Sequence, residues 1–235
     1  TIARPHATRA AVYRITLRGD ADPGTALARD AHQEVRNLEG NTFELHVHPA
    51  RPGRPASQAK APPAPAEFLS PCHYIDRDER VRELARKAVG SEKDPWQKAR
   101  RIERWVKQSM RPDNAAPLTP ASGVARTLRG DCRLYALLTA ALCRAEGIPA
   151  RTAVGLIYVE KNRRPWMGFH LWTEVYVDGR WLGLDATLGL GKVGAAHVKI
   201  ADHSWHDTES LTPLLPAARI LGKIAIEVVS TQAER

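Results

Sequence analysis

Residues 130–151 read GDCRLYALLTAALCRAEGIPAR, and residues 169–187 read FHLWTEVYVDGRWLGLDAT. Within the first stretch, apolar residues recur at helical spacing over positions 134–142, which predicts a helix with one buried face. Gly147 ends this helix, because glycine commonly follows the last turn. The second stretch alternates in polarity on both sides of Asp178-Gly179, a pattern that predicts two strands joined by a two-residue hairpin turn. The sequence therefore predicts a buried helix followed by antiparallel β structure.

Cys132 stands at the start of the predicted helix, after Gly130. A helix N-terminus carries about half a positive charge and free N–H groups, which favour a thiolate over a thiol. The same N–H groups could hold a developing oxyanion. Cys143 lies further along the same helix without either advantage, so we expect it to be a small buried apolar residue. Cys132 is therefore the candidate nucleophile, and Cys72 is given no catalytic role.

The hairpin predicts that His170 and Asp185 share one face of the sheet. If Asp178-Gly179 is the whole turn, Asp185 lies opposite Trp172 on the neighbouring strand. Side chains alternate with period two, so His170 and Trp172 point to the same face. His170 and Asp185 then become diagonal neighbours, about 7–8 Å apart by Cα and within side-chain reach. A register slip of one residue would separate them, so the pairing depends on the turn.

These residue types match the needs of a thiol enzyme. A cysteine nucleophile requires a base, and the base requires a third group that fixes its orientation. Cys132 as nucleophile, His170 as base and Asp185 as orienting acid fill the three roles. Trp166 and Trp172 flank the pair and are predicted to bind substrate along a groove, although core or rim packing is the alternative.

The two stretches resemble the bacterial transglutaminase-like superfamily. The resemblance covers roughly residues 72–229, and its motif core runs from 130 to 187. It implies a papain-like α+β fold, in which the nucleophile helix packs on an antiparallel β-sheet, and the same three catalytic roles. Members hydrolyse amide bonds through an acyl-enzyme or transfer the acyl group to an amine. The calcium-site context of animal transglutaminases is not recognisable here, so no metal or other cofactor is expected.

The remaining sequence predicts how the chain is organised. Residues 1–50 contain alternating segments at 11–17 and 42–48 and are predicted to form an N-terminal β accessory region. Residues 51–71 are rich in proline and are predicted to be a linker, which leaves 72–235 as the catalytic domain. Residues 30–37 fit either a strand or a short helix. The other expected elements are helices at 76–89 and after Asp94-Pro95, loops at 112–120 and 161–165, and strands at 151–159 and 224–229.

Composition and charge exclude several classes of protein. The 235 residues are 43% hydrophobic and 26% charged, as in a globular domain, and no apolar run approaches the ~18 residues of a membrane span. The net charge of +9 comes from scattered basic residues without an aromatic-interleaved strip, so we expect a solvated basic surface and no nucleic-acid partner. The resemblance implies a protein or peptide substrate. The first residue is Thr1, and such a trimmed start favours an extracytoplasmic location, periplasmic or secreted.

Two groups of histidines invite comparison with metal sites. The first is His46 with His48, and the second is His197 with Asp202, His203, His206 and Asp207. Neither group has a recognised zinc spacing, so a polar surface or loop is the preferred interpretation. Glu174, two residues after Trp172, is expected to face solvent.

The sequence therefore predicts a thiol enzyme that acts on amide bonds through an acyl-enzyme at Cys132, as a cysteine peptidase or amidase does. The alternatives are an amine-accepting, protein-crosslinking transglutaminase and a non-catalytic module of the same fold that binds protein or glycan. A metal-dependent hydrolase would instead lose activity to chelators and ignore alkylation of its cysteines.

Overall fold

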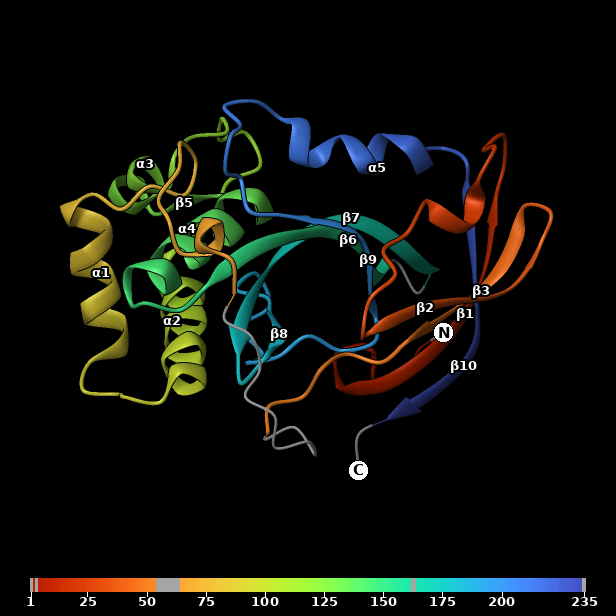
Figure 1. Cartoon of the computed structure of the whole chain (residues 1–235), viewed down its shortest axis with the longest axis horizontal. Helices are drawn as coiled ribbons and strands as arrows, with labels where there is room; N and C mark the ends of the chain where they lie inside the picture. Colours follow the sequence, from red (N-terminus) through yellow and green to blue (C-terminus); the bar gives the residue numbers. More distant parts are fainter. Residues whose placement is uncertain (1, 3, 54–63, 162–163, 234–235) are drawn as a thin grey trace.

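The computed structural model describes residues 2, 4–53, 64–161 and 164–233. It has a mixed α+β architecture of helices packed against antiparallel sheets, as predicted. Figure 1 shows most of its helices gathered at one end, one β-sheet at the other end, and a second, strongly curved sheet between them. Most of the predicted linker, residues 54–63, lies outside the described part of the chain.

Capping residues set the starts of the first two helices. Asp78 accepts a hydrogen bond from the backbone N–H of Val81 at 2.9 Å, and Asp94 accepts one from Gln97 at 2.8 Å. The helices of the structure are α1 (Glu79–Val89), α2 (Pro95–Ser109), α3 (Ala121–Thr127), α4 (Cys132–Ala145) and α5 (Leu215–Ile220). The predictions for α1, α2 and α4 are confirmed, whereas α3 and α5 are short helices that the apolar periodicity did not reveal.

Helix α4 lies at the centre of the helical layer and is buried along most of its length. Asp131 caps its start by accepting a hydrogen bond from the N–H of Arg133 at 3.0 Å. Gly130 is required just before the cap, because a Cβ at this position would lie 2.5 Å from Cβ of Leu134. On the sheet side, Thr173 donates a hydrogen bond to the carbonyl oxygen of Ala136 at 3.0 Å. These contacts fix the start of the helix, and with it Cys132, against the sheet.

The curved sheet has the strand order β8-β7-β6-β9, and all of its neighbours are antiparallel. Its strands are β6 (Ala150–Lys161), β7 (Arg164–Val177), β8 (Arg180–Leu184) and β9 (His197–His203). Val177 pairs with Arg180 across the β7–β8 turn, which confirms the predicted register. Asp178 and Gly179 have φ angles of 50° and 78°, the left-handed values that this turn requires.

Two features of the curved sheet differ from the predictions. Strand β7 begins at Arg164, so the predicted loop over residues 161–165 is largely strand; residues 162–163 lie outside the described part. Strand β9 was not predicted, and it pairs with β6 at the edge of the sheet.

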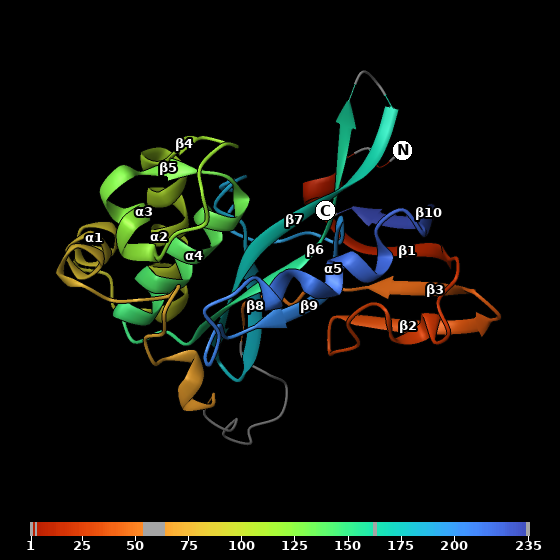
Figure 2. The ribbon, with the colours of Figure 1, turned by 90° about the horizontal axis from the view of Figure 1, so that it is seen from above.

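The second sheet joins both ends of the chain in the order β10-β1-β3-β2 (Figure 2). Its strands are β1 (Thr8–Leu17), β2 (Gln33–Glu39), β3 (Thr42–Val47) and β10 (Ile224–Ala233), so the undecided segment near residue 33 is a strand. The short strands β4 (Arg111–Pro112) and β5 (Arg129–Gly130) form a separate parallel pair.

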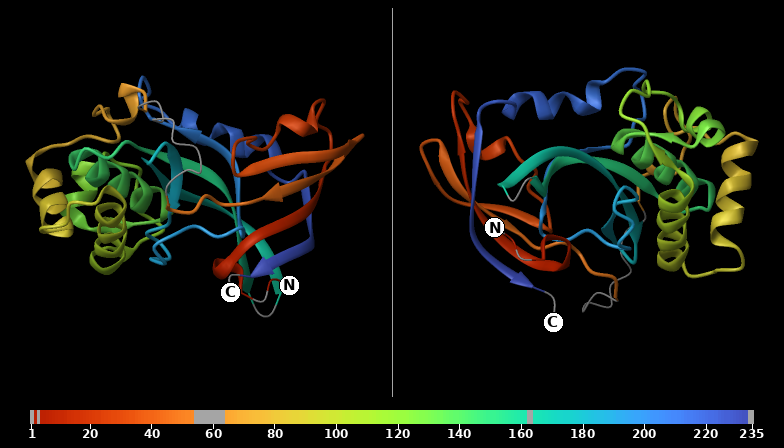
Figure 3. Two further views of the ribbon diagram at one scale, coloured as in Figure 1. Left: turned by 60° about the horizontal axis from the view of Figure 1, so that its bottom comes forward. Right: turned by 180° about the vertical axis from the view of Figure 1, so that it is seen from behind.

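The two large sheets share one hydrophobic core. Tyr13, Phe43 and Leu45 of the N-terminal sheet belong to the same buried cluster as Leu156 and Val198 of the curved sheet. Figure 3 shows the two sheets side by side from two further directions, and their side chains share the buried cluster. The predicted domain limits at 1–50, 51–71 and 72–235 stay a prediction, while the described strands show that β10 completes the N-terminal sheet.

Candidate active site

Cys132 occupies the first position of α4 and is partly exposed, with a free thiol. It therefore stands at the positive end of the helix dipole. Cys143 is fully buried, as predicted, and burial raises the pKa of its thiol far above the ordinary value. Cys72 is partly exposed and lies 3.8 Å from a guanidinium nitrogen of Arg144. Cys132 is thus the only one of the three that combines exposure with a helix start.

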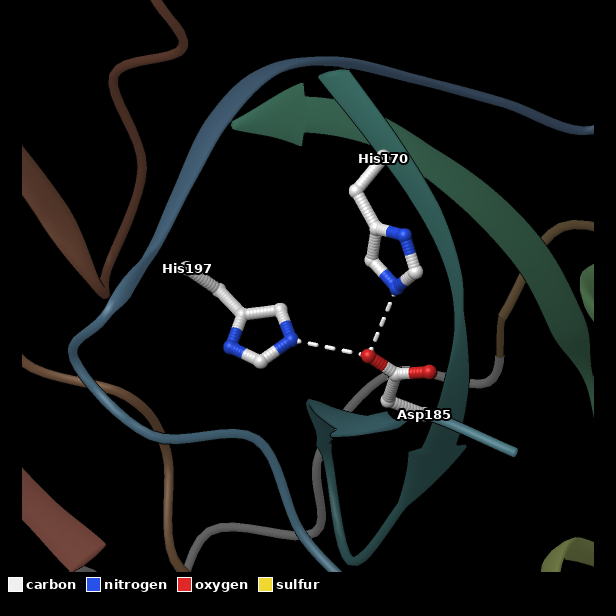
Figure 4. A group of neighbouring side chains, drawn as sticks. All are labelled: His170, Asp185 and His197. Atoms are coloured by element: carbon white, nitrogen blue, oxygen red, sulfur yellow. Dashed lines mark hydrogen bonds and ion pairs between the residues drawn. The ribbon is translucent and has the colours of Figure 1, made fainter. Parts of the chain in front are cut away.

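His170 on β7 and Asp185, directly after β8, form a buried hydrogen-bonded pair. His170 Nε2 lies 2.7 Å from Asp185 Oδ2, and the two residues are 7% and 1% exposed (Figure 4). Their proximity follows from the hairpin register, as the sequence predicted. Since Nε2 faces the carboxylate, Nδ1 is the ring nitrogen that remains for a second partner.

Cys132 is the other neighbour that acts on the protonation of the His170 ring. Burial alone would lower the pKa of His170, but the hydrogen bonds and negative charges of Asp185 and Cys132 outweigh it and raise that pKa to about 10. The site therefore favours a protonated imidazole at His170. The structure brings together the three residues that the sequence analysis selected for catalysis.

Asp185 is itself held from several directions. Its Oδ1 accepts hydrogen bonds from the backbone N–H groups of Thr187 at 3.0 Å and Leu188 at 3.4 Å. Burial would raise the pKa of Asp185, but the hydrogen bonds from His170 and His197 outweigh it and lower the pKa below its usual range. The carboxylate is therefore kept ionised although it is buried.

Glu103 on α2 supports Asp185 from the opposite side. Its Oε1 accepts a hydrogen bond from the backbone N–H of Asp185 at 3.3 Å. Burial and the nearby charge of Asp185 raise the pKa of Glu103 to about 7. Two buried carboxyl groups thus lie close together with opposite shifts, and Glu103 is a group that the sequence analysis did not single out.

His197 is a second imidazole on the same carboxylate oxygen. Its Nε2 lies 3.0 Å from Asp185 Oδ2, and the residue is 4% exposed (Figure 4). The sequence analysis considered His197 only with its near neighbours as a weak metal group. The alternation of Val198 and Ile200 with polar residues was the available signal that a strand places His197 toward the site.

The set of His170, Asp185 and His197 also has the chemistry of metal ligands, since their candidate ligand atoms lie within 4.8 Å of one another. The separations of 2.7 and 3.0 Å to Oδ2 are those of hydrogen bonds. Ligand atoms around tetrahedral zinc lie about 3.3 Å apart for bonds of about 2.0–2.1 Å. Because the observed contacts are shorter than that, a hydrogen-bonded network fits these residues better than a metal site.

The two predicted substrate-binding tryptophans lie in different surroundings. Trp166 is 55% exposed on β7, whereas Trp172 is 3% exposed and packs edge-on against the ring of His197 at 5.2 Å. Their role in substrate binding stays a prediction. Glu174 was expected to face solvent, which is wrong: it is 6% exposed and pairs with Arg151 and Lys199 at 2.7 and 3.1 Å.

A helix-borne cysteine beside a strand-borne histidine–aspartate pair defines a papain-like α+β protein. Residues 82–186 match the model of the transglutaminase-like superfamily, so this part of the chain is similar to the domain of that superfamily. An uncharacterized protein of Haemophilus influenzae is 33% identical over 95 residues, which are 38% of this chain and 26% of that protein. The match therefore spans about a quarter of that relative.

One solved structure agrees with the assignment of the fold, and a second is only a similar structure. A proposed cysteine protease from Cytophaga hutchinsonii has a TM-score of 0.59 at 18% identity, covering 96% of this chain and 87% of that one. The periplasmic domain of TgpA from Pseudomonas aeruginosa has a TM-score of 0.44 at 17% identity, covering 80% and 91%. Among the described residues, the helices are all too short or too polar to cross a membrane.

Proposed function

We propose that this protein is a thiol enzyme that cleaves amide bonds through an acyl-enzyme at Cys132, with a protein or peptide as substrate. The observation that carries the proposal is the 2.7 Å contact of His170 with buried Asp185, on a ring whose other neighbour is Cys132 at a helix start. Each of the three groups has the environment that its role requires.

The chemistry follows from these positions. The Cys132 thiolate attacks the amide carbonyl carbon and forms a C–S bond, while the carbonyl oxygen becomes an oxyanion near the N–H groups of the α4 start. Protonated His170 gives a proton to the amide nitrogen, and the C–N bond breaks to release an amine. Water then attacks the thioester, His170 takes its proton, and the C–S bond breaks to leave a carboxylic acid and the thiolate. Asp185 orients His170 throughout.

An amine in place of water would turn the same acyl-enzyme into a transglutaminase, because the second attack would form a new amide. The exposure of Trp166 and its place near His170 in the sequence support a role in contacting either substrate. Its ring covers Gly168, where an added Cβ would lie 3.4 Å away, and Gly168 is two residues before His170. Trp166 also borders a cavity of about 270 Å³ together with Tyr158 and Ile226.

The proposal also includes a location outside the cytoplasm for this protein.

The proposal is tested by alkylating the chain with iodoacetamide from pH 4 to 9 and following each cysteine by peptide mass. We expect Cys132 to react at pH 6, where an ordinary thiol with a pKa of about 8.5 is almost wholly protonated. His170→Ala should slow this reaction at least tenfold at pH 6, because it removes the imidazolium that stabilises the thiolate.

Cys72 and Cys143 act as internal references, and His206→Ala is the matched control at a histidine outside the site, 40% exposed by side chain. If Cys132 reacts no faster than Cys72 and His170→Ala changes nothing, the acyl-enzyme proposal fails and the non-catalytic binding module takes its place. A metal-dependent hydrolase would show activity that a chelator abolishes and alkylation leaves intact.

A further inference from the structure

We propose that His197 is a positioning residue of this site: its Nε2 donates a hydrogen bond to Asp185 and holds the carboxylate that orients His170. The inference rests on the proposed function, since it assigns His197 a part in the same site. His197 lies beyond residues 82–186, the part of the chain that matches the superfamily.

The geometry places two imidazoles on one oxygen atom. His170 Nε2 and His197 Nε2 lie 2.7 and 3.0 Å from Asp185 Oδ2, while the two rings are 6.1 Å apart by centroid and inclined at 60°. Figure 4 shows the rings approaching the carboxylate from different sides. The side chain of His197 is 1% exposed, so this donor is built into the protein interior. The backbone N–H groups of Thr187 and Leu188 hold Oδ1, so both oxygens of Asp185 accept hydrogen bonds and the carboxylate has little freedom to rotate.

The hydrogen-bond pattern of His197 fits a donor that acts through Nε2. Its Nδ1 is buried and has no hydrogen-bond partner among the described residues. An imidazole with a hydrogen on Nε2 needs an acceptor there, and Asp185 Oδ2 supplies it. Asp185 is therefore the one hydrogen-bond partner of the His197 ring among the described residues, which ties the orientation of the ring to that of the carboxylate.

Neighbouring rings fix the orientation of His197. Trp172 contacts it edge-on with centroids 5.2 Å apart, and His6 lies on another side at 6.3 Å. Burial and the neighbouring His197 lower the pKa of His6, so the imidazole of His6 tends to stay neutral. The buried Trp172, which the sequence analysis assigned to substrate binding, therefore supports the ring that holds Asp185.

The N-terminal sheet holds the backbone just before His197. The N–H of Ala195 donates to the carbonyl oxygen of Thr8 at 2.8 Å, and the carbonyl oxygen of Ala195 accepts from the hydroxyl of Tyr13 at 2.7 Å. Thr8 and Tyr13 both belong to β1. The chain thus uses its N-terminal sheet to place a donor in the active site, which gives that sheet a role in the proposed reaction.

The test compares His197→Gln with His197→Met in the full-length chain. Both substitutions remove the ring and its contact with Trp172, and the two side chains are nearly equal in size. Only glutamine has an N–H donor at its end. We measure the alkylation rate of Cys132 between pH 5 and 9 and the thermal unfolding of each variant. Three titratable residues face His197 directly: Asp185, His170 and His6. Glu174 and Lys199 line the same small cavity as His197. The titrations of these five groups contribute to the pH dependence of Cys132 alkylation in every variant.

We expect His197→Met to slow Cys132 alkylation at pH 6 by about ten- to a hundredfold and to move the profile toward that of an ordinary thiol. His197→Gln should restore most of the rate although its melting temperature is similar. Equal rates in the two variants, whether both high or both low, would overturn the inference, because the donor would then make no difference. His170→Ala in the same series separates the two proposals: if it leaves the rate unchanged, the proposed function fails; if it alone slows alkylation, only the role of His197 fails.

Discussion

At the scale of single residues, the site depends on how two buried carboxyl groups divide their roles. Asp185 accepts hydrogen bonds on both oxygens, so its charged form is favoured and its pKa is lowered. Glu103 lies beside it, and burial together with the charge of Asp185 raises the pKa of Glu103 to about 7. The charge of Asp185 is therefore well compensated, whereas the charge that Glu103 gains above neutral pH lowers the free energy of unfolding.

We predict that Glu103→Gln stabilises the protein at pH 8 and changes little at pH 5. The pKa of Glu103 rises from 4.5 to about 7 on folding, so the folded state binds its proton more tightly than the unfolded state does. This contribution is complete below pH 4.5 and is lost as the pH rises through 7. At about 1.4 kcal/mol per pKa unit, the loss by pH 8 reaches about 3 kcal/mol. Glutamine cannot ionise, so the Glu103→Gln variant does not suffer this loss in the free energy of unfolding.

Urea unfolding at pH 5, 6, 7 and 8 measures this difference in the free energy of unfolding. Glu227→Gln is the matched control, because Glu227 forms an ion pair with Arg14 and its side chain is 67% exposed. A gap between Glu103→Gln and the wild type that stays constant with pH would contradict the prediction.

At the scale of secondary-structure elements, the β7–β8 hairpin could be predicted because its signals are local. The Asp178-Gly179 turn and the flanking alternation fix the register, and the register brings His170 to Asp185. Strand β9 was missed, although Val198 and Ile200 alternate with polar residues. Its burial depends on partners far away in the sequence, which no local pattern shows.

Glu174 illustrates the same difficulty. A lone glutamate on a strand usually faces water. Here Arg151 of β6 and Lys199 of β9 converge on Glu174 of β7, and Lys199 also pairs with Asp30 near the N-terminal sheet. Burial would lower the pKa of Lys199, but Glu174 and Asp30 outweigh it and raise the pKa. The network joins three strands of the curved sheet, so the local sequence around Glu174 could not show that this residue is buried.

We predict that Glu174→Gln lowers the free energy of unfolding by about 3 kcal/mol, since removing one partner of a buried ion pair leaves the other charges poorly compensated. Asp30 remains beside Lys199 and keeps the loss at the lower end of the usual range. Urea unfolding at pH 7 measures the change, and Glu227→Gln is again the control, with an expected effect below about 0.5 kcal/mol. Equal effects of the two substitutions would show that the buried network adds no more stability than a surface pair.

At the scale of the whole molecule, we predict that the two large sheets unfold as a single cooperative unit. β1 pairs with β10, and the inward side chains of the N-terminal sheet share a core with the curved sheet. The sequence places a proline-rich boundary between these parts, because it shows composition along the chain and not which distant segments pack together. The shared core predicts that damage to the N-terminal sheet weakens the folded state around the active site.

Leu45→Ala tests this cooperativity. Leu45 on β3 is 0% exposed in the shared core, and the substitution should cost about 2–5 kcal/mol. All six tryptophans lie between Trp96 and Trp205, outside the N-terminal sheet, so tryptophan fluorescence reports on the rest of the molecule. We expect the fluorescence midpoint in urea to fall in a single transition. Leu38→Ala, at a leucine that is 46% exposed on β2, should hardly move it. If Leu45→Ala leaves the fluorescence midpoint unchanged, residues 1–50 unfold independently and the N-terminal sheet does not support His197.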